Sequence, residues 1–205
     1  MDFLERLESV KSTLTLHEIN VNIADIEVWT SDSKYIPYIL YHVKDLDVEV
    51  FFKLYDNVIH LCALWSNWKL LLCMWRGYYT YDRNYAHFYL LPEIVQYSNY
   101  NTVLVSLLAM CSWLHEDDQE FEPEDLFNAS KLNKKHPEVE DLCMRAYYTS
   151  KYYLSMYVDA DSDSESDYDD KTIKLIENRK DFYVKEAKLA GIYEQFLTSK
   201  PCATN

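Results

Sequence analysis

One apolar stretch, Asn57–Gly77, limits the folds open to this chain most strongly, because it holds three of the five tryptophans and needs extensive burial. At a helical period its large apolar residues fall on one face and its polar residues on the other. Asp56 or Asn57 can cap the first turn, and Arg76 and Gly77 suit the last. The stretch therefore predicts one buried amphipathic helix that packs on other elements. Its apolar face comprises Leu61, Leu64, Trp65, Trp68, Leu71, Leu72 and Trp75.

A β-hairpin is the alternative for the same stretch, with strands at Ile59–Trp65 and Trp68–Trp75 and a turn at Ser66 and Asn67. This turn lacks the Asn-Gly or Asp-Gly pair that tight hairpins favour, so the helix is the preferred interpretation.

The segments before and after this stretch predict different structures. Residues 2–16 carry an apolar stripe at helical spacing. Three short runs show apolar alternation or are rich in aromatic and β-branched residues, which predicts three antiparallel strands in a meander. These runs are residues 19–28, Lys34–Val43 and Asp47–Tyr55. A fourth strand is expected around 85–91.

Helices are expected again in the second half, over Asn101–Glu116, from Pro137 onward and over Thr172–Ser199, with an acidic loop at His115–Asp125. The predicted fold class is therefore α+β: an N-terminal helix, a short antiparallel β-meander, then packed α-helices. All-α is the alternative. The element order is similar to that of RWD and ubiquitin-conjugating folds, although no His-Pro-Asn motif precedes a cysteine.

Three regions follow along the chain. Residues 1–158 are expected to form a single globular domain. Residues 159–170 (DADSDSESDYDD) are expected to be a disordered acidic linker, because like charges at this density repel one another and nothing apolar can be buried. Residues 171–200 are expected to form a C-terminal helix.

Composition excludes several classes of function. Only two of the 205 residues are glycine, and there is no glycine-rich phosphate loop or nucleophile elbow, so no cofactor is expected. The net charge of −14 opposes nucleic-acid binding. No uncharged apolar run reaches 18 residues, so no membrane partner is expected. Five scattered cysteines and no signal peptide indicate a reduced, intracellular protein, cytoplasmic or nuclear.

Two cysteine–histidine pairs have spacings that could suit a metal site or a cysteine nucleophile. Cys111 and His115 lie four residues apart on a predicted helix, but a structural zinc site needs two further ligands. His60 and Cys62 would share a face only on a strand. Neither pair predicts a metal or catalytic residue, and an enzyme is disfavoured. The alternative function is a cysteine-dependent, conjugating-type transferase.

The acidic linker carries three serines that each have an acidic residue three positions later: Ser162, Ser164 and Ser166. This pattern resembles the acceptor sites of casein kinase 2, and phosphorylation would increase the negative charge. The expected partner is another protein with a basic patch. A virus-encoded inhibitor that masks a basic surface of a host protein is a variant of this idea.

Tyrosine is the other conspicuous residue, with nineteen copies. Tyrosines concentrate in protein interfaces because their rings are large and their hydroxyls stay hydrated. The chain is therefore predicted to be a non-enzymatic adaptor or regulatory protein with an aromatic binding surface. The candidate partner-binding residues are Tyr78, Tyr79, Tyr81, Tyr147, Tyr148, Tyr152, Met156, Tyr157 and Val158.

Overall fold

A computed structural model describes nine parts of the chain. These are residues 3–16, 25–27, 31, 57–58, 60–69, 71–72, 91–113, 123–158 and 166–199. The chain divides into two compact units, residues 1–94 with 200–205, and residues 95–199. The division falls within α7 (Leu91–Tyr97), and each unit is treated by itself below.

The α+β prediction is wrong for the described chain, which is all-α: helices and short connections account for every described residue. The only described parts of the predicted meander, Asp25–Glu27 and Ser31, are helical, and Ile26 is buried. Ile26 and Val28 alternate over too short a run to distinguish a strand from one helical turn. The predicted strands at Lys34–Val43 and Asp47–Tyr55 lie outside the described residues.

The first unit begins with α1 (Phe3–Leu16), which confirms the predicted N-terminal helix. Leu7, Val10 and Leu14 form its buried stripe. Arg6 is buried on the same helix, where its Nη2 lies 3.3 Å from Oε1 of Glu93.

The described residues of the Asn57–Gly77 stretch are helical on both sides of a break, so they do not form one helix. The chain turns at Trp65–Asn67 and becomes helical again from Trp68. Ser66 adopts a φ of 53°, its N–H donates to the carbonyl of Ala63 (3.0 Å), and the next N–H donates to Cys62 (2.9 Å). These are the two hydrogen bonds of a Schellman helix ending.

The predicted orientation of the tryptophans is therefore only partly correct. Leu61 and Leu71 are fully buried, whereas Trp65 is 41% exposed and Trp68 is half-buried. Polar His60 is buried as well, because residues 60–63, ahead of the break, are buried on every side of the helix. Residues 73–77, including Trp75, lie outside the described residues.

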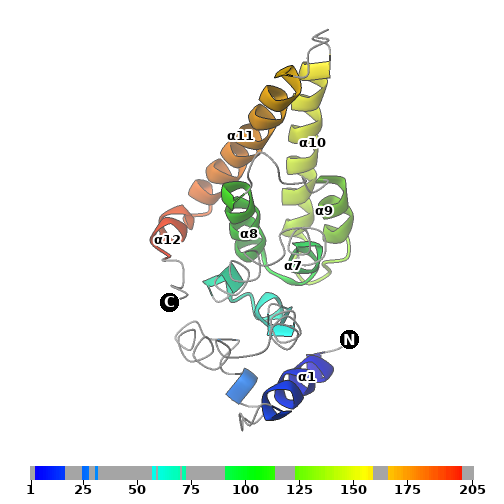
Figure 1. The fold of residues 1–205 in the computed structure, drawn as a ribbon, viewed down its shortest axis with the longest axis vertical. Helices are drawn as coiled ribbons and strands as arrows, with labels where there is room; N and C mark the ends of the chain where they lie inside the picture. Colours follow the sequence, from blue (N-terminus) through cyan, green and yellow to red (C-terminus); the bar gives the residue numbers. More distant parts are fainter. Residues whose placement is uncertain are drawn as a thin grey trace. The chain divides into compact units, whose positions relative to one another are not determined.

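The second unit is built around α8 (Tyr100–Trp113), and its helices are labelled in Figure 1. Every residue from Thr102 to Cys111 is buried, so this helix has no solvent-facing side over three turns. Asn99 caps it, with Oδ1 accepting from the N–H of Thr102 (2.9 Å).

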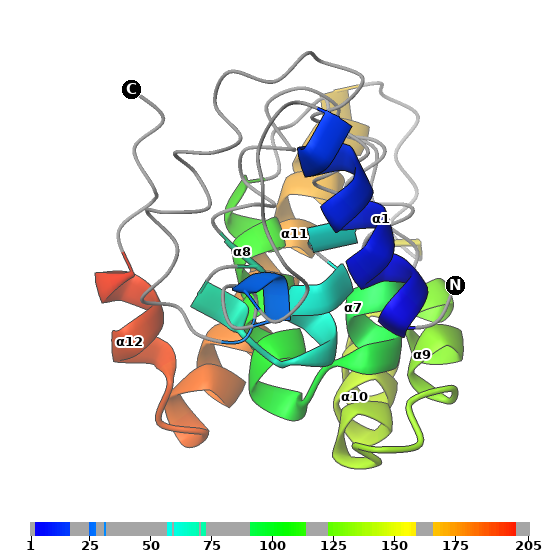
Figure 2. The same cartoon turned by 90° about the horizontal axis from the view of Figure 1, so that it is seen from below.

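Three helices follow α8 in this unit: α9 (Pro123–Ser130), α10 (Glu138–Val158) and α11 (Ser166–Leu189). α11 packs on both α8 and α10, and α9 packs on α10. Figures 1 and 2 show α9 beside the first half of α10, while α10 and α11 continue together beyond it. α9 begins inside the segment predicted as a loop, because Pro123 and the acidic residues after it suit a first helical turn.

The predicted C-terminal helix is divided into α11 and α12 (Tyr193–Thr198), which leaves the end of α11 at an angle (Figures 1 and 2). Gly191 has a φ of +70° and donates its N–H to Lys188 (3.1 Å), while Ile192 donates to Ala187 (3.0 Å). Glycine takes this left-handed conformation without the strain that a Cβ adds.

Candidate functional site

Three of the predicted partner-binding tyrosines lie together on α10. Tyr148 is 58% exposed and Tyr152 is 62% exposed, while Tyr147 between them and α9 is half-buried. The buried stripe of α10 consists of Val139, Leu142, Cys143, Ala146 and Ser150. The tyrosines lie off this stripe at helical spacing, so their exposure follows from the periodicity of the helix.

The other predicted partner-binding residues are less well defined. Tyr78, Tyr79 and Tyr81 lie outside the described residues. Met156, Tyr157 and Val158 form the last turn of α10, where the backbone alone is described.

α9 extends the tyrosine face with one more ring. Phe127 stacks on Tyr147 with 5.8 Å between ring centroids and 16° between ring planes. Tyr147 also meets Tyr148 edge-on at 5.2 Å. Such pairs contribute about 0.5–1.5 kcal/mol beyond their area, so the rings hold one another in place.

Two lysines lie over these rings. Nζ of Lys131 is 4.1 Å from the centroid of Phe127 and donates to Oδ1 of Asn128 at 2.9 Å. Nζ of Lys151 is 5.7 Å from the centroid of Tyr147. Ammonium groups at these distances are attracted to the ring faces. We call this set the aromatic–lysine surface: Phe127, Lys131, Tyr147, Tyr148, Lys151 and Tyr152.

The turn between α9 and α10 is held by one buried side chain, Asn133, which is 4% exposed. Its Nδ2 donates to the carbonyls of Val95 (2.9 Å) and Ser98 (2.8 Å), and its Oδ1 accepts from the N–H of His136 (3.1 Å). The turn therefore has a fixed shape and presents exposed residues at its tip. These are Lys131, Leu132, Lys134 and Lys135.

Behind the surface, α10 is tied to its neighbours by an ionic network. Arg145 donates to Glu186 of α11 (2.7 Å) and to Asp141 (2.9 Å), and the hydroxyl of Tyr100 donates to the other oxygen of Glu186 (2.9 Å). The hydrogen bond from Arg145 lowers the pKa of Glu186 against the opposing effect of burial. Burial and the bond to Glu186 raise the pKa of Tyr100. The network fixes α10 and needs no ligand to do so.

The predicted phosphorylation sites fall at the edge of the described chain. Ser162 and Ser164 lie outside the described residues, and Ser166 is the first residue of α11. Residues 166–170 of the predicted linker are thus helical, and acidic residue types are favoured in a first helical turn.

The described thiols are poorly suited to nucleophilic chemistry. Burial raises the pKa of Cys62, and it raises that of Cys143 to about 12. Cys111 is also buried and forms no disulfide. A thiolate is the reactive form, so none of the three is activated. Cys73, His115 and Cys202 lie outside the described residues.

The first unit contains a partly buried pair, His60 and Glu93, that resembles an acid–base dyad. Nδ1 of His60 lies 2.7 Å from Oε2 of Glu93, whose other oxygen meets Arg6. Burial alone would raise the pKa of Glu93, but the hydrogen bond and charge of His60 and the charge of Arg6 hold it below its ordinary value. The nearby thiol, Cys62, is two residues along the same helical turn and faces another way.

The described residues form neither a metal site nor a membrane span. Across the described ranges, no three His, Cys, Asp or Glu side chains are grouped so as to bind a metal ion. Within those ranges, none of the helices combines the length and the apolar character needed to span a bilayer.

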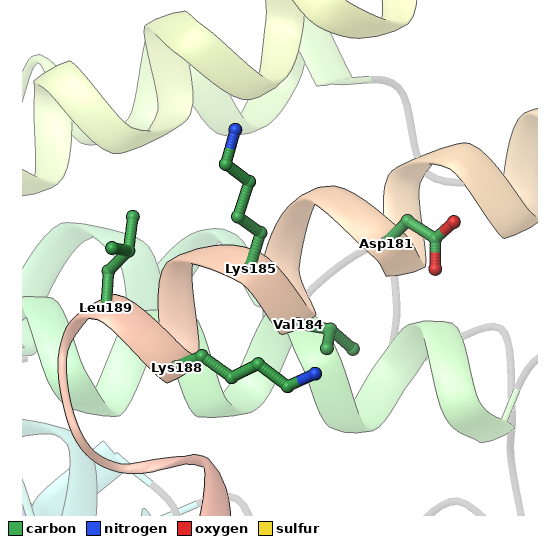
Figure 3. A pocket seen from close by; sticks show the side chains of 5 residues that line it. All are labelled: Asp181, Val184, Lys185, Lys188 and Leu189. Carbon is green, nitrogen blue, oxygen red and sulfur yellow. The ribbon is translucent and has the colours of Figure 1, made fainter.

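An open pocket of about 440 Å³ lies along α11, lined by Asp181, Val184, Lys185, Lys188 and Leu189. Figure 3 shows that all five side chains come from this one helix and diverge from one another. A small-molecule site instead has polar groups that converge on the ligand, so this pocket is a helix face and not a ligand site.

Comparison with known proteins identifies no relative: no protein-family model matches the chain, no curated protein matches it, and no solved structure matches it. Function therefore has to be inferred from the described residues themselves.

Sequence reasoning located the exposed tyrosines but missed three members of the surface, Phe127, Lys131 and Lys151. A signal was present, because Phe127 and Lys131 are four residues apart, and so are Tyr147 and Lys151. Residues at this spacing meet on a helix, which pairs each ring with an ammonium group.

Proposed function

We propose that the protein is an intracellular, non-enzymatic interaction protein, an adaptor or regulator, that binds another protein through the aromatic–lysine surface. The observation that carries the proposal is the exposure of Tyr148 and Tyr152 on a rigid helix. Solvent-exposed aromatic rings that are already ordered lose little conformational entropy on binding. Tyrosine is also enriched among the residues that dominate binding energy.

The acidic segment at residues 159–170 supplies a second contact. It follows α10 directly and would dock on a basic patch of the partner, in the cytoplasm or nucleus. Phosphorylation of Ser162, Ser164 or Ser166 would strengthen that contact by adding roughly −1.5 to −2 charges per site. No described thiol has the exposure that the conjugating-type alternative requires.

The test is site-specific photocrosslinking in cells, followed by reconstitution. A photoreactive phenylalanine analogue replaces Tyr148 or Tyr152, and the matched control replaces Leu197, which is similarly exposed on α12. A discrete partner should be captured from the first two positions and not from the third. With that partner purified, Tyr148→Ala and Tyr152→Ala should each weaken binding by about 5- to 30-fold, as interface tyrosines do.

Equal capture from all three positions would contradict the proposal. Unchanged affinity of the two tyrosine variants for the purified partner would do so as well.

A further inference from the structure

The aromatic–lysine surface has a local charge opposite to that of the chain. The whole sequence contains 34 acidic and 20 basic residues. Residues 126–137 and 142–158 contain no Asp or Glu, yet they hold five of the basic residues. These are Lys131, Lys134, Lys135, Arg145 and Lys151.

The carboxylates nearest in sequence lie at the margins of this region, and the acidic residues 159–170 follow it directly. Glu124 and Asp125 occupy the first turn of α9, and Glu138, Glu140 and Asp141 occupy the first turn of α10. Asp141 is bonded to Arg145, and Glu138 lies 3.5 Å from His136. The exposed lysines of the region, Lys131, Lys134, Lys135 and Lys151, therefore form a local concentration of positive charge, and acidic residues bound it on both sides in the sequence.

The lysines of the surface are also held in place before any partner arrives. Lys131 is fixed by its ring and by Asn128, and Nζ of Lys134 donates to the carbonyl of Lys131 at 2.7 Å. Lys151 lies over Tyr147. An ordered ammonium group loses less side-chain entropy on binding than a mobile one, so these charges can contribute to affinity and to orientation.

We propose that the aromatic–lysine surface binds an acidic segment of the partner protein in which carboxylates alternate with apolar or aromatic side chains. The carboxylates would accept from Lys131 and Lys151, and the apolar side chains would lie on Tyr148 and Tyr152. This rests on the proposed function and specifies the chemistry of the bound segment. The contact is separate from the one between the acidic residues 159–170 and a basic patch.

Single-stranded nucleic acid also binds surfaces that combine aromatic rings with cations. Nucleic acid is disfavoured here because the net charge of −14 repels a polyphosphate. A short acidic segment has fewer negative charges, so the protein repels it less. Nucleic-acid binding is therefore an outcome that the test must detect.

The test selects peptides from a random 12-residue display library on the full chain. Three baits are compared: the native protein, Lys131→Glu/Lys151→Glu, and the matched control Lys174→Glu/Lys180→Glu. The control lysines are exposed on α11, and both double variants change the charge equally. Circular dichroism establishes that each bait is folded.

The native protein and the control should enrich peptides with more Asp and Glu than Lys and Arg, together with aromatic or aliphatic residues. A synthetic copy of an enriched peptide should bind at least tenfold more weakly to Lys131→Glu/Lys151→Glu and within twofold to the control. The neutral pair Lys131→Gln/Lys151→Gln should fall between these values, and added salt should weaken binding.

Enrichment of neutral or basic peptides, equal losses in both double variants, or no enrichment would overturn the inference. Displacement of the peptide by a 12-nucleotide oligothymidylate at equal concentration would assign the surface to nucleic acid instead. If photocrosslinking at Tyr148 captures a partner while the library yields no acidic peptides, only this inference fails. If both experiments fail, the proposed function fails with it.

Discussion

Replacing Asn133 by alanine is the most informative single change in the second unit, because this one buried side chain makes three hydrogen bonds. Two go to the carbonyls of Val95 and Ser98, and the third comes from the N–H of His136. Each such bond contributes a net 0.5–1.5 kcal/mol, so Asn133→Ala should cost about 3 kcal/mol. Hydrogen exchange measured by mass spectrometry reports this locally. Amides of α9, α10 and the α7–α8 connection should exchange on the order of 100-fold faster, since about 1.4 kcal/mol corresponds to tenfold.

Asn133→Asp sharpens the test. Aspartate keeps the acceptor for the N–H of His136 but places a carboxylate oxygen against the carbonyls of Val95 and Ser98. It should therefore destabilise more than alanine at pH 7, and the difference should narrow in acid as the carboxyl becomes protonated. The control is Asn128→Ala, which removes one exposed contact and should cost about 0.5 kcal/mol or less. If Asn133→Ala accelerates exchange no more than Asn128→Ala does, the turn is not held as described.

Four further predictions concern the helices and thiols. Leu61→Ala should cost about 2–5 kcal/mol in urea unfolding and more than Trp68→Ala, because Leu61 is fully buried and Trp68 only half; the reverse order would contradict this packing. Glu186→Gln should destabilise at pH 7, because the lowered pKa of Glu186 means that folding favours its ionised form, and the difference should shrink as the pH falls below the ordinary pKa of 4.5; a difference that does not shrink in acid would refute this. Gly191→Ala should cost about 1–2 kcal/mol by thermal unfolding, entirely from backbone strain, because an added Cβ meets no atom within 4 Å; an unchanged midpoint would mean that the φ is not positive. Iodoacetamide at pH 8 should leave the three described thiols, Cys62, Cys111 and Cys143, unmodified in the native protein, as judged by peptide mapping. Labelling of any of the three would disprove its burial.

The helices of the second half could be predicted from the sequence because their signals are local. The run over Asn101–Glu116 is apolar on several sides, and the structure places α8 within it. Pro137 and the acidic residues after it mark the start of α10. The start of α9 carries the same signals at Pro123, but the acidic residues before it were interpreted as one continuous loop.

The break at Ser66 could not be predicted in this way. The apolar period continues across it, and a serine with positive φ is uncommon enough that no pattern anticipates it. Because the helix ends there, Trp65 falls in the turn and is exposed, whereas His60 lies earlier, where residues 60–63 are all buried. The aromatic–lysine surface was half predictable for a related reason: exposure of Tyr148 and Tyr152 follows from one helix, whereas Phe127 joins them only through packing between two helices.

The burial of Thr102–Cys111 in α8 has a consequence for synthesis of the chain. α11, one of the helices that covers it, ends at Leu189, 76 residues after the last residue of α8 at Trp113. At roughly 5–20 residues per second, a ribosome takes about 4–15 seconds to make that intervening chain. During this interval α8 has left the ribosome without part of its cover, and its apolar sides are available to any hydrophobic surface nearby. The nascent chain should therefore depend on a holding chaperone between the appearance of α8 and the completion of α11.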